Sequence, residues 1–280
     1  MNALTKVLTT GLLAATAGAT AQTEYVIEQG ANYSEDVFFS LEAGVVATQP
    51  TGNWDLAFDV SSPFSNAVRI NDGNGRALAV VPGVDISGWA DVDTAGYSTW
   101  PTLYNGLDTW VNGAFNVGTS DDPSDFGWGT YSGPPLHQVI GDSIYVFTLE
   151  DGTAYKLRID LLNMGVWTFT YAALDGSGET TATMNMADYA GRNFAYFDFG
   201  TGWIDREPAT WDFVFTRYVG PTQYGLFPTT GALLNAGRSA SEADGVDPSA
   251  VLLADYPVAP AEIGLIGNDW KELVDFAWQV

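Results

Sequence analysis

Apolar and polar side chains alternate with a period of two along most of this chain, in short runs rich in β-branched and aromatic residues. Gly, Pro, Asn and Asp separate the runs, which is typical of strands joined by turns. Patterns with a helical period are scarce. The runs predict strands over residues 37–41, 54–60, 67–70, 77–81, 143–149, 154–160, 166–172, 193–199, 211–218 and 231–234.

The clearest local prediction is a hairpin formed by residues 143–149 and 154–159. Asp151-Gly152 lies between these two alternating runs, and Asp-Gly is a strong signal for a tight hairpin turn. No helical crossover separates the other predicted strands, so parallel βαβ units are not indicated. The sequence therefore predicts an all-β fold of antiparallel sheets.

The chain also repeats itself. An ordered series of residues returns with gaps that agree to within two residues: Tyr33, Phe38, Gly44, Pro50, Trp54-Asp55 and Phe58 reappear as Tyr189, Phe194, Gly200, Pro208, Trp211-Asp212 and Phe215. We interpret this as two related β domains, residues 22–178 and a truncated copy over 179–280. The second copy ends before its own late hairpin, and we expect the chain to be a fragment of a longer protein.

Within the repeat, the Trp-Asp pair opens a strand in each copy. Period-two geometry places Trp54 and Phe58 on one side of that strand, as parts of an aromatic core. The aspartate then points to the other face, where it can cap a turn or bond backbone groups across the sheet. We expect Asp55 and Asp212 to have this structural role.

The N-terminal segment and the overall composition indicate an exported, acidic protein. Residues 1–21 combine Lys6, an apolar stretch and Ala19-Thr-Ala21, which predicts a secretory signal peptide and a secreted or cell-surface protein. No later stretch is apolar enough for a transmembrane segment. The chain has no cysteine, so it cannot form disulfides. A net charge of −24 makes nucleic acid an unfavourable partner.

The repeated strand and the late hairpin resemble the HmuY-like family of Bacteroidetes. The similarity rests on the Trp-Asp-apolar-Ala-Phe strand at 54–58, on the late hairpin from Asp142 to Ile159, with its Asp-Gly turn and its Tyr-Lys-Leu strand, and on the closing strand at 166–171. The resemblance implies an exported all-β domain that captures haem. Tandem units of this kind often precede a C-terminal sorting domain. This chain departs from lipid-anchored members because its signal peptide has no lipobox cysteine.

Haem capture, as the resemblance implies it, needs His or Met ligands on opposite faces of the iron. The candidates are His137, in the loop 133–138, and three methionines, Met164, Met184 and Met186. None of the four belongs to the repeated series. Each also has a structural interpretation, as a surface histidine or as methionines that pack a turn or a strand.

Two other ligands are compatible with the sequence. Calcium is suggested by oxygen-bearing residues in two loops, with candidate ligands Asp72, Asn74, Asp121, Asp122 and Asp125. Carbohydrate is suggested by the abundance of Trp and Tyr. One histidine, no cysteine and no nucleophile elbow give no support to an enzyme. The preferred function is haem binding; the alternative is a structural or adhesive module that binds calcium, carbohydrate, or a host or surface ligand.

Overall fold

The computed structural model describes residues 25–107, 110–118, 121–222, 225–236, 239–242, 265–266 and 276–279. The predicted signal peptide, residues 1–21, lies outside the described residues. Within them, no helix is long and apolar enough to cross a membrane.

The prediction of an all-β fold with antiparallel sheets is confirmed, since every pair of neighbouring strands is antiparallel. The strands described in the first half are β1 (Glu35–Ser40), β2 (Gly44–Pro50), β3 (Leu56–Asp59), β4 (Val68–Ile70), β5 (Ala77–Asp85), β6 (Gly129–Tyr131) and β7 (Val139–Gly141). Those that follow are β8 (Ser143–Thr148), β9 (Ala154–Asn163), β10 (Val166–Ala173), β11 (Thr180–Asn185), β12 (Phe194–Asp198), β13 (Gly202–Ile204), β14 (Phe213–Thr222), β15 (Gly225–Leu234), β16 (Ser239–Glu242), β17 (Leu265–Ile266) and β18 (Phe276–Gln279).

The helices of the described residues are short segments of 3-10 type, three to six residues long. They are η1 (Ala31–Tyr33), η2 (Asp72–Asn74), η3 (Ile86–Asp91), η4 (Tyr97–Thr99), η5 (Ala114–Asn116) and η6 (Met186–Tyr189). The predicted hairpin is present, with Thr148 paired to Ala154 and Gly152 in the left-handed conformation that its turn requires.

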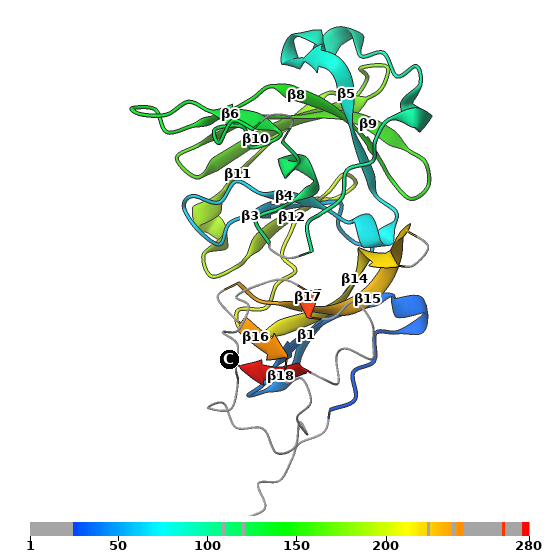
Figure 1. The fold of residues 1–280 in the computed structure, drawn as a ribbon, viewed down its shortest axis with the longest axis vertical. Helices are drawn as coiled ribbons and strands as arrows, with labels where there is room; N and C mark the ends of the chain where they lie inside the picture. Colours follow the sequence, from blue (N-terminus) through cyan, green and yellow to red (C-terminus); the bar gives the residue numbers. More distant parts are fainter. Residues whose placement is uncertain are drawn as a thin grey trace, which may run out of the picture.

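Three sheets lie on top of one another (Figure 1). The seven-stranded sheet contains β5 to β11, the four-stranded sheet has the order β13-β12-β3-β4, and the five-stranded sheet has the order β17-β15-β14-β1-β2. The four-stranded sheet lies in the middle, and β3 and β4 are buried throughout. A central strand that is covered on both faces explains why Leu56-Ala-Phe58 is apolar at every position.

Alternate side chains of the middle sheet enter two different cores. Leu56 and Phe58 point into the first core, where they meet Trp167 and Phe169 of the seven-stranded sheet. Ala57 points into the second core, against the five-stranded sheet. Thus the period-two pattern places one strand in contact with both neighbouring sheets.

Strands from the two copies pair reciprocally. In the five-stranded sheet, β1 of the first copy pairs with β14 of the second, and in the four-stranded sheet, β12 of the second copy pairs with β3 of the first. Strands from both sides of the predicted boundary between residues 178 and 179 therefore share two sheets. The division into domains stays a prediction.

The strand pairing also defines which residues of the two copies are equivalent. Phe39 of β1 pairs with Phe213, and Phe197 of β12 pairs with Leu56 in the equivalent way. In the hairpins that follow these strands, Ser40 pairs with Gly44, and Asp198 pairs with Gly202. Gly44 therefore corresponds to Gly202, and both have positive φ. The match of Gly44 with Gly200 from the sequence is therefore two residues too early, and so is the match of Phe38 with Phe194, because the pairing makes Phe38 equivalent to Tyr196.

The expectation that Trp54 and Phe58 share one face is wrong. Trp54 packs with the second core, where its ring meets Tyr196 with centroids 5.2 Å apart, whereas Phe58 lies in the first core. The alternation fails because regular strand begins only at Leu56. The same break occurs in the second copy, where Trp211 meets Phe38 at 5.2 Å.

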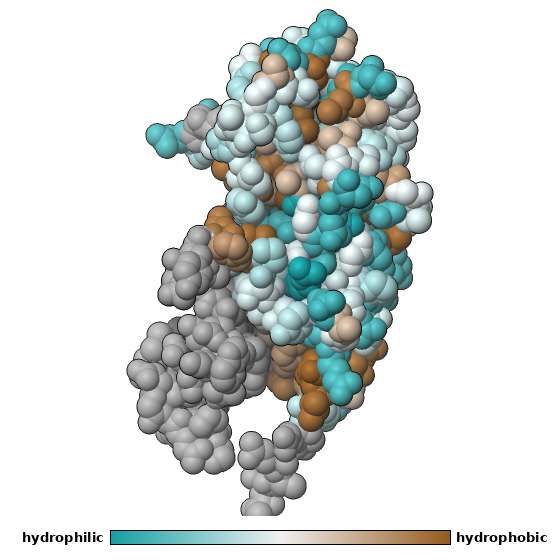
Figure 2. Space-filling model, turned by 90° about the vertical axis from the view of Figure 1, so that its right-hand side faces the viewer, coloured by the Kyte–Doolittle hydropathy of each residue, from teal (hydrophilic) through white to brown (hydrophobic). Residues whose placement is uncertain are grey.

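The surface of the described part is mixed. In the face shown in Figure 2, hydrophilic side chains gather over the middle and at the upper tip, and hydrophobic side chains form separate patches between and beside them.

Candidate functional site

His137 lies at the tip of the loop between β6 and β7. The loop is closed by two backbone hydrogen bonds, from Ser132 N to Gln138 O at 2.8 Å and from His137 N to Gly133 O at 2.9 Å. The imidazole is exposed, and its Nδ1 is hydrogen-bonded to the hydroxyl of Tyr131. This contact orients the ring and leaves Nε2 as the nitrogen that can meet a ligand.

Met164 occupies the two-residue turn between β9 and β10. Asn163 pairs with Val166 across this turn, and both Met164 and Gly165 have positive φ, as a type I′ turn requires. The side chain of Met164 is 91% exposed. Methionine is usually buried, so a methionine side chain that is exposed to solvent on a tight turn is unusual.

Strand pairing brings these two residues to the same end of the seven-stranded sheet. Val139 of β7 pairs with Leu162 of β9 in antiparallel register. His137 lies two residues before Val139, and Met164 lies two residues after Leu162. The β6–β7 loop and the β9–β10 turn are therefore neighbours, because adjacent strands are separated by only about 5 Å.

Exposed apolar side chains surround this pair. Leu136 is 61% exposed, Ile140 47% and Val166 37%, and they belong to the same loop or to the adjoining ends of β7 and β10. Together with Met164 they form what we term the apolar end of the seven-stranded sheet. Contiguous exposed apolar side chains often mark a place where a ligand or partner binds.

The other two candidate haem ligands are buried. Met184 is 5% exposed and Met186 8%, and both belong to the first core. Met186 also lies under the Met164 turn, where its backbone N–H donates to Gly165 O at 2.8 Å. Of the four predicted ligands, the structure brings only His137 and Met164 together at the surface.

The calcium candidates have protein donors on their oxygens. Asp72 accepts hydrogen bonds from Gly73 N and Asn105 N, and the side-chain oxygen of Asn74 accepts from Thr51 and Arg217. Such N–H and O–H donors occupy the lone pairs that a cation would need.

The aspartates of the second predicted calcium loop also accept hydrogen bonds from the protein. Asp122 accepts from Ser124 N at 2.9 Å, Asp125 accepts from Gly127 N at 2.7 Å, and Asp121 is exposed. Among the described residues, no group of three or more His, Asp or Glu side chains is placed to hold a metal ion. Calcium binding stays a prediction.

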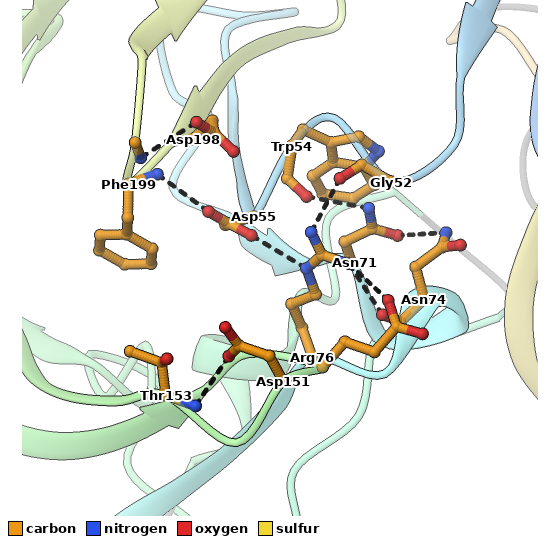
Figure 3. A network of polar contacts seen from close by, with 12 residues as sticks. Gly52, Trp54, Asp55, Asn71, Asn74, Arg76, Asp151, Thr153, Asp198 and Phe199 are labelled. Carbon is orange, nitrogen blue, oxygen red and sulfur yellow. Dashed lines mark hydrogen bonds and ion pairs between the residues drawn. The ribbon is translucent and has the colours of Figure 1, made fainter.

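The two repeated aspartates tie the copies together through backbone groups. Asp55 N donates to Phe197 O at 2.8 Å and its carboxylate accepts from Phe199 N at 2.9 Å (Figure 3). In the equivalent arrangement of the second copy, Asp212 N donates to Phe39 O at 2.8 Å, and the Asp212 carboxylate accepts from Leu41 N at 2.7 Å. Both aspartates thus bond backbone across the sheets, in the structural role that their repetition indicates.

Asp55 has an additional charged partner. Its carboxylate lies 2.9 Å from Nε of Arg76, whose other nitrogens donate to the backbone oxygens of Asn74 and Gly52 (Figure 3). Burial raises the pKa of Asp55, while the hydrogen bond from Phe199 and the Arg76 guanidinium act in the opposite direction.

A cleft that was not predicted from the sequence lies beside the apolar end. It lies between the ends of β10 and β11, the segment 188–192 and β13, with a volume of about 680 Å³. Trp203, Tyr189, Arg192 and Asp205 line it. No local sequence signal unites these residues, since they come from separate turns that only the stacking of the sheets assembles.

Comparison of the chain with protein-family models, with curated proteins and with solved structures finds no match.

Proposed function

We propose that this chain is an exported, non-enzymatic binding protein that captures haem at the apolar end of the seven-stranded sheet, between His137 and Met164. The observation that carries the proposal is their placement on neighbouring turns. They are the one histidine of the chain and a methionine that is 91% exposed. The sequence resemblance to HmuY-like proteins and the predicted signal peptide support the same function.

The residues present fit the ligand chemically. Imidazole nitrogen and thioether sulfur are both haem-iron ligands, and two axial ligands must approach the iron from opposite faces. The haem therefore has to enter between the two turns. The Tyr131 hydroxyl at Nδ1 holds the imidazole, as a hydrogen bond to the second ring nitrogen commonly does for a ligating histidine.

The apolar end supplies the remaining contact. A porphyrin is a flat apolar ring, and Leu136, Ile140 and Val166 offer apolar area to it. Burying such area contributes about 25 cal/mol for each Å² removed from water. The bonds from His137 and Met164 to the iron would then make the site selective for an iron porphyrin, and apolar contact would supply much of the affinity.

Hemin titration of the mature protein tests the proposal. We expect a Soret shift at micromolar hemin, lost or strongly weakened in His137→Ala and altered in position in Met164→Ala. Met186→Leu is the control, because it replaces a buried methionine with a residue of similar volume, away from solvent. No Soret shift, or identical spectra for all four proteins, would refute a haem site at these residues.

The alternative is a structural or adhesive module without haem. The cleft described above, with its aromatic and polar lining, favours a carbohydrate ligand for that alternative. A protein that ignores hemin but attaches to cells or polysaccharide would support it.

A further inference from the structure

The cleft next to η6 has the size and walls of a small-molecule site. Its volume of about 680 Å³ lies within the range of about 300–1,000 Å³ usual for ligand pockets. It is open to solvent on one side and has Met184 and Trp203 among its lining residues. It adjoins the apolar end through Val166, and it differs from the apolar end because half of its lining residues are polar or charged.

Two aromatic rings give the cleft a firm apolar wall. Trp203 and Tyr189 have ring centroids 6.4 Å apart, with an angle of 55° between their planes. Trp203 also packs against Phe58 and Phe197 in the first core, with centroids 5.4 and 5.1 Å away. Since the core holds the indole, a ligand that stacks on it meets a surface with little rotamer freedom to lose.

Charged and polar groups stand around that wall. Arg192 Nη2 lies 3.4 Å from an Asp205 carboxylate oxygen, and Asp188 is a further exposed carboxylate of the cleft. Burial raises the pKa of the Tyr189 hydroxyl, and the carboxylates of Asp188 and Asp205 raise it further, so the hydroxyl stays neutral. The cleft thus offers acceptors, a bidentate donor and a hydroxyl side by side.

The balance of charge excludes one class of ligand. Two carboxylates against one guanidinium leave a net negative cleft on a chain of net charge −24. An anionic ligand, including the propionate groups of haem, would be repelled there. A neutral ligand with many hydroxyl groups meets no such penalty and can use every polar group of the rim.

The two copies differ at the position of this tryptophan. Trp203 pairs with Phe197 in β13·β12 as Val45 pairs with Phe39 in β2·β1, so Trp203 and Val45 are equivalent. Val45 is 49% exposed, whereas Trp203 packs against the first core. The aromatic wall of the cleft is therefore particular to the second copy, where the same indole also belongs to the core packing.

We propose that this cleft binds a neutral saccharide, with the sugar ring on Trp203 and its hydroxyl groups bonded by Asp205, Arg192 and Asp188. Aromatic rings accept the apolar C–H face of a sugar, and carboxylate and guanidinium groups bond paired hydroxyls in bidentate fashion. The saccharide site uses neither His137 nor Met164 and shares only Val166 with the apolar end, so the protein would have two ligands of different chemistry at neighbouring places.

Ligand-observed NMR and calorimetry with a panel of neutral sugars (glucose, galactose, mannose, N-acetylglucosamine and their disaccharides) test the proposal. At about 10 mM sugar, even a millimolar site is nearly saturated. We expect saturable binding of at least one sugar. Asp205→Asn and Trp203→Phe should each weaken it about tenfold, the loss expected for one hydrogen bond to a charged group or one stacking contact.

Two matched controls make the outcome specific. Glu42→Gln removes an exposed carboxylate from the equivalent β1–β2 turn and should leave sugar binding unchanged. His137→Ala should also leave it unchanged, which separates this site from the haem proposal. Absence of saturable binding across the panel, or equal affinity in Asp205→Asn, Trp203→Phe and the controls, would overturn the saccharide site.

Discussion

At the scale of single residues, the two Trp-Asp pairs make the same kind of backbone hydrogen bonds in two different sheets. Each aspartate uses its N–H, its carbonyl and its carboxylate to bond backbone groups, with Asn71 N donating to Asp55 O at 3.1 Å and Asn235 N to Asp212 O at 2.8 Å. Both side chains are buried, at 1% and 5% exposure. Asp55 also forms an ion pair with Arg76.

The ion pair sets the cost expected for replacing Asp55. Asp55→Ala should lower the free energy of unfolding by about 3–5 kcal/mol, because it leaves the largely buried Arg76 guanidinium with only the exposed Glu150 carboxylate, 3.9 Å away. Urea unfolding of the variant measures the loss.

A second substitution identifies the source of this loss. In Asp55→Ala/Arg76→Met the guanidinium is also absent, so part of the stability lost in Asp55→Ala should return. No recovery in the double variant would show that the ion pair is not responsible.

At the scale of elements, the middle sheet depends on close backbone approach. Gly113 precedes η5, which packs on β4, and a Cβ atom at Gly113 would lie 2.0 Å from Val68 O. Gly113 itself has φ −79°, so its backbone conformation is open to any residue. Its absence of a side chain is therefore needed for space alone.

Gly113→Ala should lower the free energy of unfolding by about 3 kcal/mol, because the new methyl group forces η5 away from β4. Gly52→Ala is the matched control: a Cβ at Gly52 meets nothing within 4 Å, and a change within about 0.5 kcal/mol is expected. Thermal or urea unfolding distinguishes the two, and similar effects for both would contradict the argument.

At the scale of the whole molecule, buried carboxyl groups and net charge act in the same direction with pH. Burial raises the pKa of Glu207 to about 7, although Asn193 N, Phe194 N and the Tyr196 hydroxyl donate to it. Four buried aspartates have pKa values raised for the same main reason: Asp36, Asp55, Asp59 and Asp72.

Carboxyl groups with raised pKa values make the folded state bind more protons than the unfolded state. Stability therefore falls as pH rises from the unfolded pKa to the folded one, which for Glu207 is the window from about 4.5 to about 7. Self-repulsion of a chain with net charge −24 at pH 7 adds to this fall. We expect a higher urea midpoint at pH 5 than at pH 8.

Glu207→Gln tests the assignment, because the amide cannot ionise. The difference in unfolding free energy between pH 5 and pH 8 should be smaller in this variant than in the parent protein. A parent protein that is more stable at pH 8, or a variant with the same pH dependence, would contradict a protonated Glu207 in the folded state.

Much of the fold could be predicted from local patterns. Each predicted strand corresponds to an observed one, and the Asp151-Gly152 hairpin is in place. Strands that were not predicted are mostly short or polar, as with β6, β7 and β13 of three residues each. Three residues are too few for a period of two to be recognised.

The candidate sites show the same limit. His137 and Met164 could be named from their chemistry, but their proximity depends on the pairing of β7 with β9, and β7 left no signal in the sequence. Met184 and Met186 carry the same thioether group, yet they lie in the core. The cleft around Trp203 is formed by the ends of β10 and β11, by the segment 188–192 and by β13, and it was not predicted from the sequence.

The sequence by itself determined the strand-rich class, the hairpin turns and the repetition, because alternation, Asp-Gly turns and matched motifs act over neighbouring residues. Only the tertiary structure decided that the copies exchange strands, that Trp54 and Phe58 enter different cores, and which methionine meets solvent. Those outcomes depend on contacts between residues far apart in the chain, and local patterns of side chains do not encode them.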